Sequence, residues 1–173
     1  MNVLILNGSP RPQGNTAKMI SAFRETAEGK GHTVNVVDVC RKNIHGCLAC
    51  EHCHQIEHGV CVQKDDMQEV YGLLKEAEML ILASPIYYHG ISGQLKCTID
   101  RFYAALYPKE HFNLSKIAMF LCSGDPDMYV GAEFSFKGDF LEYLGLEDKG
   151  IYTCAKEINE EVLEQVRRLA EEL

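Results

Sequence analysis

The chain has 173 residues, of which 46% are apolar and 24% charged, and these values are typical of one folded domain. Acidic residues outnumber basic ones by 25 to 17, which gives a formal net charge of −8 at pH 7. Because nucleic-acid phosphates and anionic membrane surfaces repel an acidic chain, we expect no nucleic-acid partner and no membrane partner. We also expect residues 1–173 to form a single domain.

The cysteine content indicates chemistry rather than cross-linking. The start of the chain has no basic n-region and no cleavage site, which predicts a cytoplasmic protein with reduced thiols. Eight cysteines are many for such a protein, and four of them lie between Cys47 and Cys61. This clustering favours metal or redox chemistry over disulfides. We expect the other four to be small core residues: Cys40, Cys97, Cys122 and Cys154.

Strands and helices alternate along the first half of the chain. A continuous apolar run over residues 3–6 predicts a strand buried on both faces, and residues 16–29 place apolar side chains on one helical face. A second strand is expected over residues 33–39 and a cysteine-rich insertion over about 40–62. A helix over 65–77 and a third strand over 79–83 follow.

The same alternation continues in the second half. Ser92 is expected to cap a helix that runs to about residue 106, and the fourth strand is expected over residues 116–122. A helix within residues 131–144, a strand over 149–154 and an amphipathic helix over 158–173 complete the pattern. Five strands alternating with helices predict an open, doubly wound α/β sheet with helices on both faces. Ligands of such sheets bind outside the carboxyl ends of the strands, so the loops after strands one, three and four are the candidate site.

The first of these loops, from Gly8 to Thr16, joins a buried strand to the start of a helix. Free backbone N–H groups and the helix dipole at such a corner attract a phosphate. The loop has no GxGxxG or GxxxxGK(S/T) pattern, so a monophosphate such as that of FMN is favoured over a dinucleotide or a nucleoside triphosphate. An ordinary strand-to-helix turn with a capping Thr16 is the alternative.

Two loops together resemble a known superfamily. Gly8-Ser9-Pro10-Arg11 with Gly14-Asn15-Thr16 resembles the FMN phosphate loop of the NADPH-dependent FMN reductase and flavodoxin-like oxidoreductase superfamily. Residues 84–96 resemble its SPIYxxxxSGxLK segment. The resemblance implies FMN in a three-layer flavodoxin-like fold, with a five-stranded parallel sheet in the order 2-1-3-4-5.

The resemblance also implies which residues contact the cofactor. The phosphate neighbours would be Ser9, Arg11, Gln13, Gly14, Asn15 and Thr16. The flavin-ring neighbours would be Pro85, Ile86, Tyr87, Tyr88, His89 and Gly90 on one side, with Ser123 and Gly124 on the other. Backbone donors in the loop from Pro85 to Gly90 would stabilise the reduced ring. The alternative for the two tyrosines is packing on a neighbouring helix or subunit.

The cysteine motif is Cys47-x₂-Cys50-x₂-Cys53-x₇-Cys61, and its short gaps allow four thiolates to converge on one centre, as in iron–sulfur proteins. The motif resembles that of the iron–sulfur flavoproteins, which join a flavodoxin fold to a [4Fe–4S] cluster, and Lys64-Asp65-Asp66-Met67 fits the same group. Zinc, with a ligand from His52, His54 or His58, is one alternative, although structural zinc sites usually have two separated pairs of ligands. A loop of free thiols is another.

These observations predict an FMN-dependent enzyme with no catalytic acid, base or nucleophile, because the flavin carries the chemistry. NAD(P)H would reduce the flavin, which would reduce another flavin, a quinone or a similar small acceptor. An electron carrier that relays electrons between FMN, a [4Fe–4S] cluster and a ferredoxin-like protein is the alternative. A non-enzymatic metal-binding module is a third. The resemblance further implies a homodimer or homotetramer.

Overall fold

The computed structural model describes residues 1–106 and 112–173, and within them five parallel strands form one sheet in the order β2-β1-β3-β4-β5. The order predicted from the family resemblance is confirmed. The strands are β1 (Asn2–Asn7), β2 (Thr33–Val37), β3 (Met79–Pro85), β4 (Lys116–Ser123) and β5 (Glu147–Ala155). In-register pairs such as Leu4 with Leu80 and Leu80 with Ile117 hold the three central strands together.

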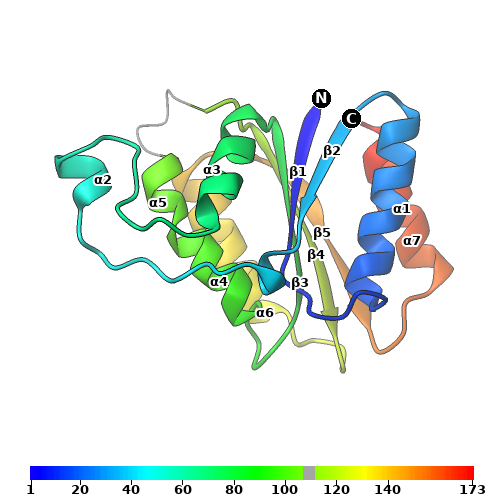
Figure 1. The fold of residues 1–173 in the computed structure, drawn as a ribbon. Coiled ribbons are helices and arrows are strands. Elements are labelled where there is room, and N and C mark those ends of the chain that lie inside the picture. The colour runs from blue at the N-terminus through cyan, green and yellow to red at the C-terminus, as the bar shows by residue number, and fades with distance from the viewer. Residues whose placement is uncertain (107–111) are drawn as a thin grey trace.

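Helices cover both faces of this sheet (Figure 1). Helices α1 (Asn15–Gly29) and α7 (Glu160–Glu171) pack side by side on one face. The other face carries α3 (Met67–Glu76), α4 (Gly93–Asp100), α5 (Phe102–Ala105), α6 (Val130–Ser135) and the π-helix η3 (Phe136–Tyr143). The cysteine-rich segment, with the short elements η1 (Val39–Arg41) and α2 (His52–Gln55), lies beyond α3 and α5 on that second side.

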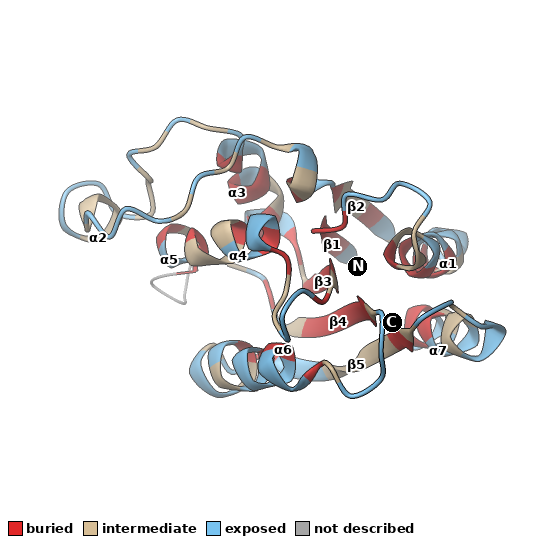
Figure 2. Ribbon diagram, turned by 90° about the horizontal axis from the view of Figure 1, so that it is seen from below, coloured by how far each residue is buried: buried red, intermediate tan, exposed pale blue. Residues whose placement is uncertain are grey.

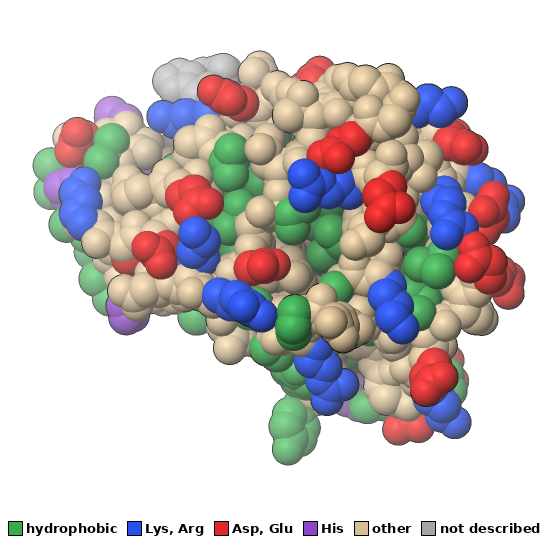
Figure 3. All heavy atoms as spheres, turned by 45° about the vertical axis from the view of Figure 1, so that its right-hand side comes forward, with side chains coloured by type: hydrophobic (Ala, Val, Ile, Leu, Met, Phe, Trp, Pro, Cys, Tyr) green, Lys and Arg blue, Asp and Glu red, His purple; other side chains and the backbone are tan. Residues whose placement is uncertain are grey.

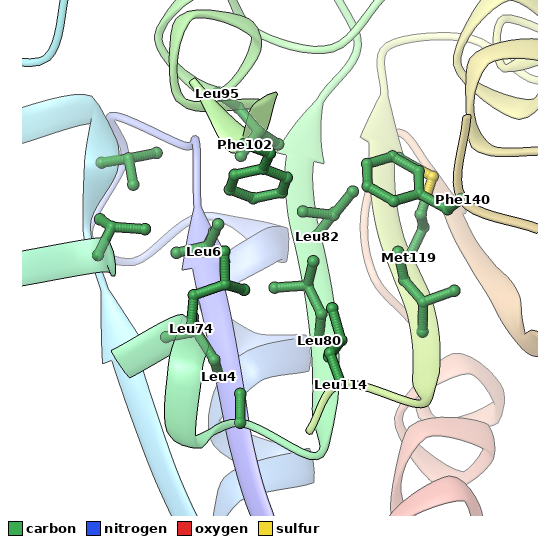
Figure 4. Close-up of a cluster of buried hydrophobic side chains, with 14 of the residues drawn as sticks. Leu4, Leu6, Leu74, Leu80, Leu82, Leu95, Phe102, Leu114, Met119 and Phe140 are labelled. Atoms are coloured by element: carbon green, nitrogen blue, oxygen red, sulfur yellow. The ribbon is translucent and has the colours of Figure 1, made fainter. Parts of the chain in front are cut away.

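The sheet separates two hydrophobic cores, because successive side chains of a strand point to opposite faces. Val3 and Ile5 pack toward α1 and α7, whereas Leu4 and Leu6 pack toward α3 and α4. Figure 4 shows the second core, where Leu74 of α3 and Phe102 of α5 point toward the strand side chains. In Figure 2 the central strands β1, β3 and β4 are almost wholly buried, whereas β5 is mostly intermediate, and this explains why β1, β3 and β4 read as continuous apolar runs.

The surface is polar and mixed in charge. On the face drawn in Figure 3, acidic and basic side chains are interspersed rather than gathered into one field. Within the described ranges, no helix combines the length and the apolar character that a bilayer crossing requires.

Three local predictions differ from the structure. The helix expected over residues 92–106 begins at its Ser92 cap, whose hydroxyl accepts from Leu95 N, but it breaks at Arg101 into α4 and α5. The second strand ends at Val37, and η1 turns the chain away from the sheet. The cysteine-rich segment contains α2, whose four residues are too short for an apolar period to reveal.

The core prediction for the other cysteines is half correct. Cys122 and Cys154 are buried, on adjacent strands at paired positions. For Cys40 and Cys97 the prediction is wrong, because both are partly exposed, Cys40 in η1 and Cys97 in α4. The Cys40 Sγ donates a hydrogen bond to Ser9 O at 3.0 Å, which joins the start of that segment to the loop after β1.

Gly8 provides a test of the close packing behind that loop. A Cβ at this position would collide with Ser92 Oγ and lie 2.9 Å from Leu95 Cβ. We expect Gly8→Ala to lower the free energy of unfolding by about 1–3 kcal/mol, the usual range for overpacking. Urea denaturation measures the effect. Gly72→Ala is the matched control, because Gly72 lies in α3 with nothing within 4 Å of an added Cβ, and we expect it to stabilise by about 0.5–1 kcal/mol. Equal effects of the two substitutions would contradict the packing described here.

Candidate functional site

The loops that follow β1, β3, β4 and β5 enclose one cleft at the carboxyl edge of the sheet, the edge that faces the viewer in Figure 2. Its volume is about 330 Å³, within the range of small-molecule sites. The first loop contributes five of the predicted residues, and the later loops contribute five more: Ser9, Arg11, Gly14, Asn15, Thr16, Pro85, Ile86, Tyr87, Ser123 and Gly124. Of the predicted set, Gln13, Tyr88, His89 and Gly90 do not line it.

The loop after β1 is held in shape from behind. Gly8 N donates to Ala83 O at 2.8 Å, and Ser9 N donates to the side chain of Asn7 at 3.0 Å. Asn7 in turn donates to Asp38 at 2.8 Å, beside the start of η1. These bonds pair the backbone N–H groups at the start of the loop. The first residues of α1, which follow, face the cleft.

This start of α1 has the properties of an anion site. The N-cap of α1 is Gly14, and no side chain caps the helix. A capping role for Thr16 is therefore wrong, since Thr16 is the second residue of α1 and is buried. The first N–H groups of a helix have no intrahelical partner, and here they lie in the cleft wall with the positive end of the dipole. This corner can accept a phosphoryl group.

Two basic side chains flank the corner, and sequence analysis missed one of them. Arg11 and Lys156 both line the cleft. Lys156 follows β5 with φ of +62°, its N donates to Ser123 O at 2.9 Å, and its carbonyl accepts from Asn15 Nδ2 at 2.7 Å. Lys156 could have been found from the sequence, because it comes just after the predicted fifth strand and therefore lies at the same edge of the sheet.

The loop after β3 is a tight hairpin. Tyr87 and Gly90 exchange backbone hydrogen bonds of 2.8 and 3.0 Å, and both intervening residues, Tyr88 and His89, have positive φ. This turn keeps Tyr87 in the cleft wall and leaves Tyr88 fully exposed. Ile86 N donates to Cys122 O at 2.7 Å. The amides of Ile86, Tyr87 and Gly90 are thus already paired within the protein, which leaves those of Tyr88 and His89 as the donors that this loop could offer a flavin.

The side chains at the floor of the cleft, between β4 and β5, stay protonated at neutral pH. Burial raises the pKa of the Cys122 thiol to about 12, so this thiol stays protonated at neutral pH. The Ser123 hydroxyl is hydrogen-bonded to the Tyr129 hydroxyl at 2.8 Å, and burial raises the pKa of Tyr129. These groups shape the cleft and do not ionise in it at neutral pH.

The predicted metal ligands gather at a second place. Cys47, Cys50, Cys53 and Cys61 all line one small hollow of about 20 Å³, here called the cysteine hollow. Burial raises the pKa of the Cys53 thiol, and the neighbouring thiols of the other three raise it further. Among the described residues, no three His, Cys, Asp or Glu side chains are arranged around a point as ligands of a metal ion.

The histidines considered as zinc ligands lie outside the wall of this hollow. The His54 ring stacks on Tyr103 with ring centroids 3.8 Å apart, and its Nε2 is 2.8 Å from Tyr103 O. His52 lies 3.7 Å from the Glu57 carboxylate.

A buried ion pair supports the cysteine hollow. Arg101 and Asp65 are 1% and 5% exposed, and the guanidinium donates to both carboxylate oxygens, at 2.8 and 3.3 Å, and to His45 O at 3.0 Å. Burial acts to raise the pKa of Asp65, but Arg101 and the backbone N–H groups of His45 and Met67 outweigh it and hold the pKa below its usual value. This pair anchors the segment that carries the four cysteines to α4.

Strained backbone is confined to these two places. Six residues other than glycine have positive φ in the described part of the chain: Ala49, Glu51, Tyr88, His89, Asp127 and Lys156. The first two lie in the cysteine-rich segment and the other four in loops at the carboxyl edge of the sheet. Such conformations persist where the surroundings enforce them, and they cluster at functional sites.

The fold defines a flavodoxin-like protein, and its cleft includes the uncapped helix start at the first strand-to-helix turn. The sequence model of the NADPH-dependent FMN reductase family matches residues 1–146, and the chain belongs to this family.

The curated proteins to which the chain is similar are named iron-sulfur flavoproteins. An iron-sulfur flavoprotein from Archaeoglobus fulgidus is 41% identical over 101 residues, which are 58% of this chain and 45% of that protein. An iron-sulfur flavoprotein from Methanocaldococcus jannaschii is 36% identical over 137 residues, 79% of this chain and 68% of that protein. The chain spans about half the length of the first curated relatives that it matches.

Solved structures agree on the fold. An NAD(P)H:quinone oxidoreductase from Methanothermobacter marburgensis superposes with a TM-score of 0.77 at 22% identity, over 98% of this chain and 97% of that one. An FMN-dependent NADH-azoreductase from Bacillus anthracis, in complex with FMN, gives a TM-score of 0.67 at 18% identity, over 99% and 97% of the two chains.

The Asp65–Arg101 pair predicts how stability depends on pH. A carboxyl whose pKa is lowered by folding stabilises the protein above its unfolded pKa, near 3.8, and this contribution is lost as the pH falls through the lower folded value. We expect Asp65→Asn to unfold at lower urea than the wild type at pH 7, with a difference that shrinks below pH 4. Asp100→Asn, which removes the partner of Lys96 in an exposed pair, should have a small effect at either pH. A difference between Asp65→Asn and the wild type that is the same at pH 7 and pH 3 would contradict this role.

Proposed function

We propose that the chain is an FMN-dependent oxidoreductase that takes reducing equivalents from NAD(P)H and passes them to a flavin, a quinone or a similar small acceptor. The observation that carries this proposal is the uncapped N-terminus of α1, which opens into a cleft of about 330 Å³. Family membership supports the same cofactor.

The residues of the cleft fit FMN in chemistry. Polar and basic groups, Arg11, Asn15 and Lys156, gather at the α1 end and would hold the phosphate, while Pro85, Ile86 and Tyr87 offer an apolar wall for the ring. Bound FMN would supply hydride and single-electron chemistry at its ring. The chain would anchor the phosphate, orient the ring against Tyr87 and shield one face of it from water.

The cysteine hollow favours a second component. Four thiols around one hollow are a donor set suited to an iron–sulfur cluster, and the curated relatives carry that word in their names. We infer that Cys47, Cys50, Cys53 and Cys61 hold a [4Fe–4S] cluster, which would supply one-electron transfer. The chain would then also relay electrons to or from a ferredoxin-like protein. A metal-binding module without a flavin would explain this hollow and leave the cleft without a role.

Assembly and location belong to the same proposal. Leu48, Ile56 and Val62 expose large apolar side chains on the cysteine-rich segment, and this exposure supports a homodimer or homotetramer that covers them. The cytoplasmic location stays a prediction, and the reduced state of the eight cysteines follows from it.

An absorption spectrum of anaerobically purified protein, recorded before and after NADPH, tests the function. We expect a flavin spectrum that bleaches on addition of NADPH, with a broad brown background from the cluster. A yellow-brown protein that NADPH does not bleach would favour the electron carrier. A colourless protein that takes up no added FMN would contradict the proposal as a whole.

The phosphate corner can be tested separately with Asn15→Asp. The new carboxylate would lie where the phosphate binds, and repulsion between the two anions should weaken FMN binding at least tenfold relative to Asn15→Ala. Both substitutions remove the bond to Lys156 O, so their difference isolates the charge. An acidic residue in the first turn also favours the helix, so unfolding would not explain the loss.

Riboflavin, which has no phosphate, is the matched ligand. Fluorescence titration should give equal riboflavin affinities for Asn15→Asp and Asn15→Ala and different FMN affinities. Equal FMN affinities of the two variants would place the phosphate elsewhere.

A further inference from the structure

Arg101 is the largest fully buried side chain among the described residues, and its surroundings leave one polar atom unused. Its terminal nitrogen atoms bind Asp65 and His45 O, as described above. Its Nε is buried and has no hydrogen-bond partner, the single buried side-chain nitrogen or oxygen of the described residues in that condition. A charged donor left unsatisfied in the interior is unfavourable, so its environment calls for an acceptor.

The surroundings of Arg101 point to sulfur as the acceptor. Arg101 lines the cysteine hollow together with all four cysteines and Tyr71. The oxygen acceptors that reach the guanidinium, on Asp65 and His45, are bound by its other nitrogen atoms. Glu51, Tyr71 and Tyr103 also line the hollow, but the Glu51 carboxylate accepts from the Tyr103 hydroxyl and the Tyr71 hydroxyl donates to Arg101 O. The cysteines are the lining groups that would become anionic on binding iron.

We propose that the unpaired Arg101 Nε–H donates a hydrogen bond to sulfur when an iron–sulfur cluster is bound in the cysteine hollow, and that the guanidinium raises the reduction potential of that cluster. The inference rests on the proposed function, because it requires the four cysteines to hold that cluster. Each one-electron reduction adds one negative charge to the hollow, supplied by an external reductant, and a fixed cation beside the cysteines favours the charged product. Net charge and hydrogen bonds to sulfur are among the factors that set such potentials.

The direction in which Asp65 changes the reduction potential distinguishes an electrostatic role of Arg101 from a purely structural one. Its carboxylate neutralises much of the guanidinium charge from 2.8 Å away. Removing that carboxylate should expose the cysteine hollow to more positive charge, whereas removing the guanidinium as well should take that charge away. Asp65 and Arg101 should therefore act on the potential in opposite directions, although loss of either weakens the same buried pair.

The experiment is an anaerobic redox titration with dithionite, followed by absorbance and electron paramagnetic resonance, on the reconstituted full chain. We expect Asp65→Asn to shift the reduction equilibrium at least tenfold toward the reduced cluster, about 59 mV for a one-electron couple. Asp65→Asn with Arg101→Gln should shift it back by at least the same factor. Arg101→Lys, which keeps the charge and loses the Nε–H, should lie between the wild type and the double variant.

A matched pair on the same helix serves as the control. Lys96 and Asp100 form an exposed i,i+4 ion pair on α4, and Lys96→Gln with Asp100→Asn changes the same kinds of charge. This control should leave the potential unchanged, because exposed charges are screened by solvent.

Iron and sulfide assays on every sample distinguish a failure to bind the cluster from a failure of Arg101 to affect its potential. A wild-type protein that binds neither iron nor sulfide overturns the cluster and this inference together. A loaded wild type with the same potential in Asp65→Asn and in the double variant overturns the role of Arg101 alone. If the double variant does not retain its cluster, Asp65→Asn still decides, because an unchanged or lowered potential in that variant contradicts the proposal.

Discussion

The structure depends on one constraint, that the five strands run in the same direction with helices on both faces. Parallel strands bring every strand-to-helix loop to one edge, so that the open N-terminus of α1 meets residues from three later loops there. The anion corner is therefore a product of topology: Asn15 comes from the first turn and Lys156 from the last, 141 residues apart, yet they are joined by a hydrogen bond of 2.7 Å. An isolated helix start would offer amides without this enclosure.

A second long-range contact shapes the other site. Arg101 interrupts what would be one helix, and its guanidinium binds His45 O near the start of the cysteine-rich segment and Asp65 just after its end. The start of the segment is also tied to the phosphate corner by the bond from Cys40 to Ser9 O. The segment has little regular structure of its own, so these contacts, together with the stacking of His54 on Tyr103, determine where the four cysteines lie.

The sequence reveals those features whose cause is local. Continuous apolar runs mark β1, β3 and β4, and a glycine-bounded turn before an amphipathic helix marks the phosphate corner. The break at Arg101 was not predictable, because its partner Asp65 lies 36 residues away and propensity alone continues the helix. The position of Tyr88 was missed for a related reason: its turn requires two left-handed residues that are not glycine, which only the surrounding structure can enforce.

The distribution of that strain supports two sites rather than one. A left-handed residue other than glycine costs roughly 1–2 kcal/mol, so six of them amount to a substantial part of the 5–15 kcal/mol that stabilises a typical domain. Glycine occupies left-handed positions at the end of α1 and around β5, at Gly31, Gly145 and Gly150, and also at Gly59 in the cysteine-rich segment. At the carboxyl edge, Tyr88 and Lys156 occupy such positions, and in the cysteine-rich segment Glu51 does so beside Gly59. Side chains retained against this cost in both places indicate that each place serves more than folding.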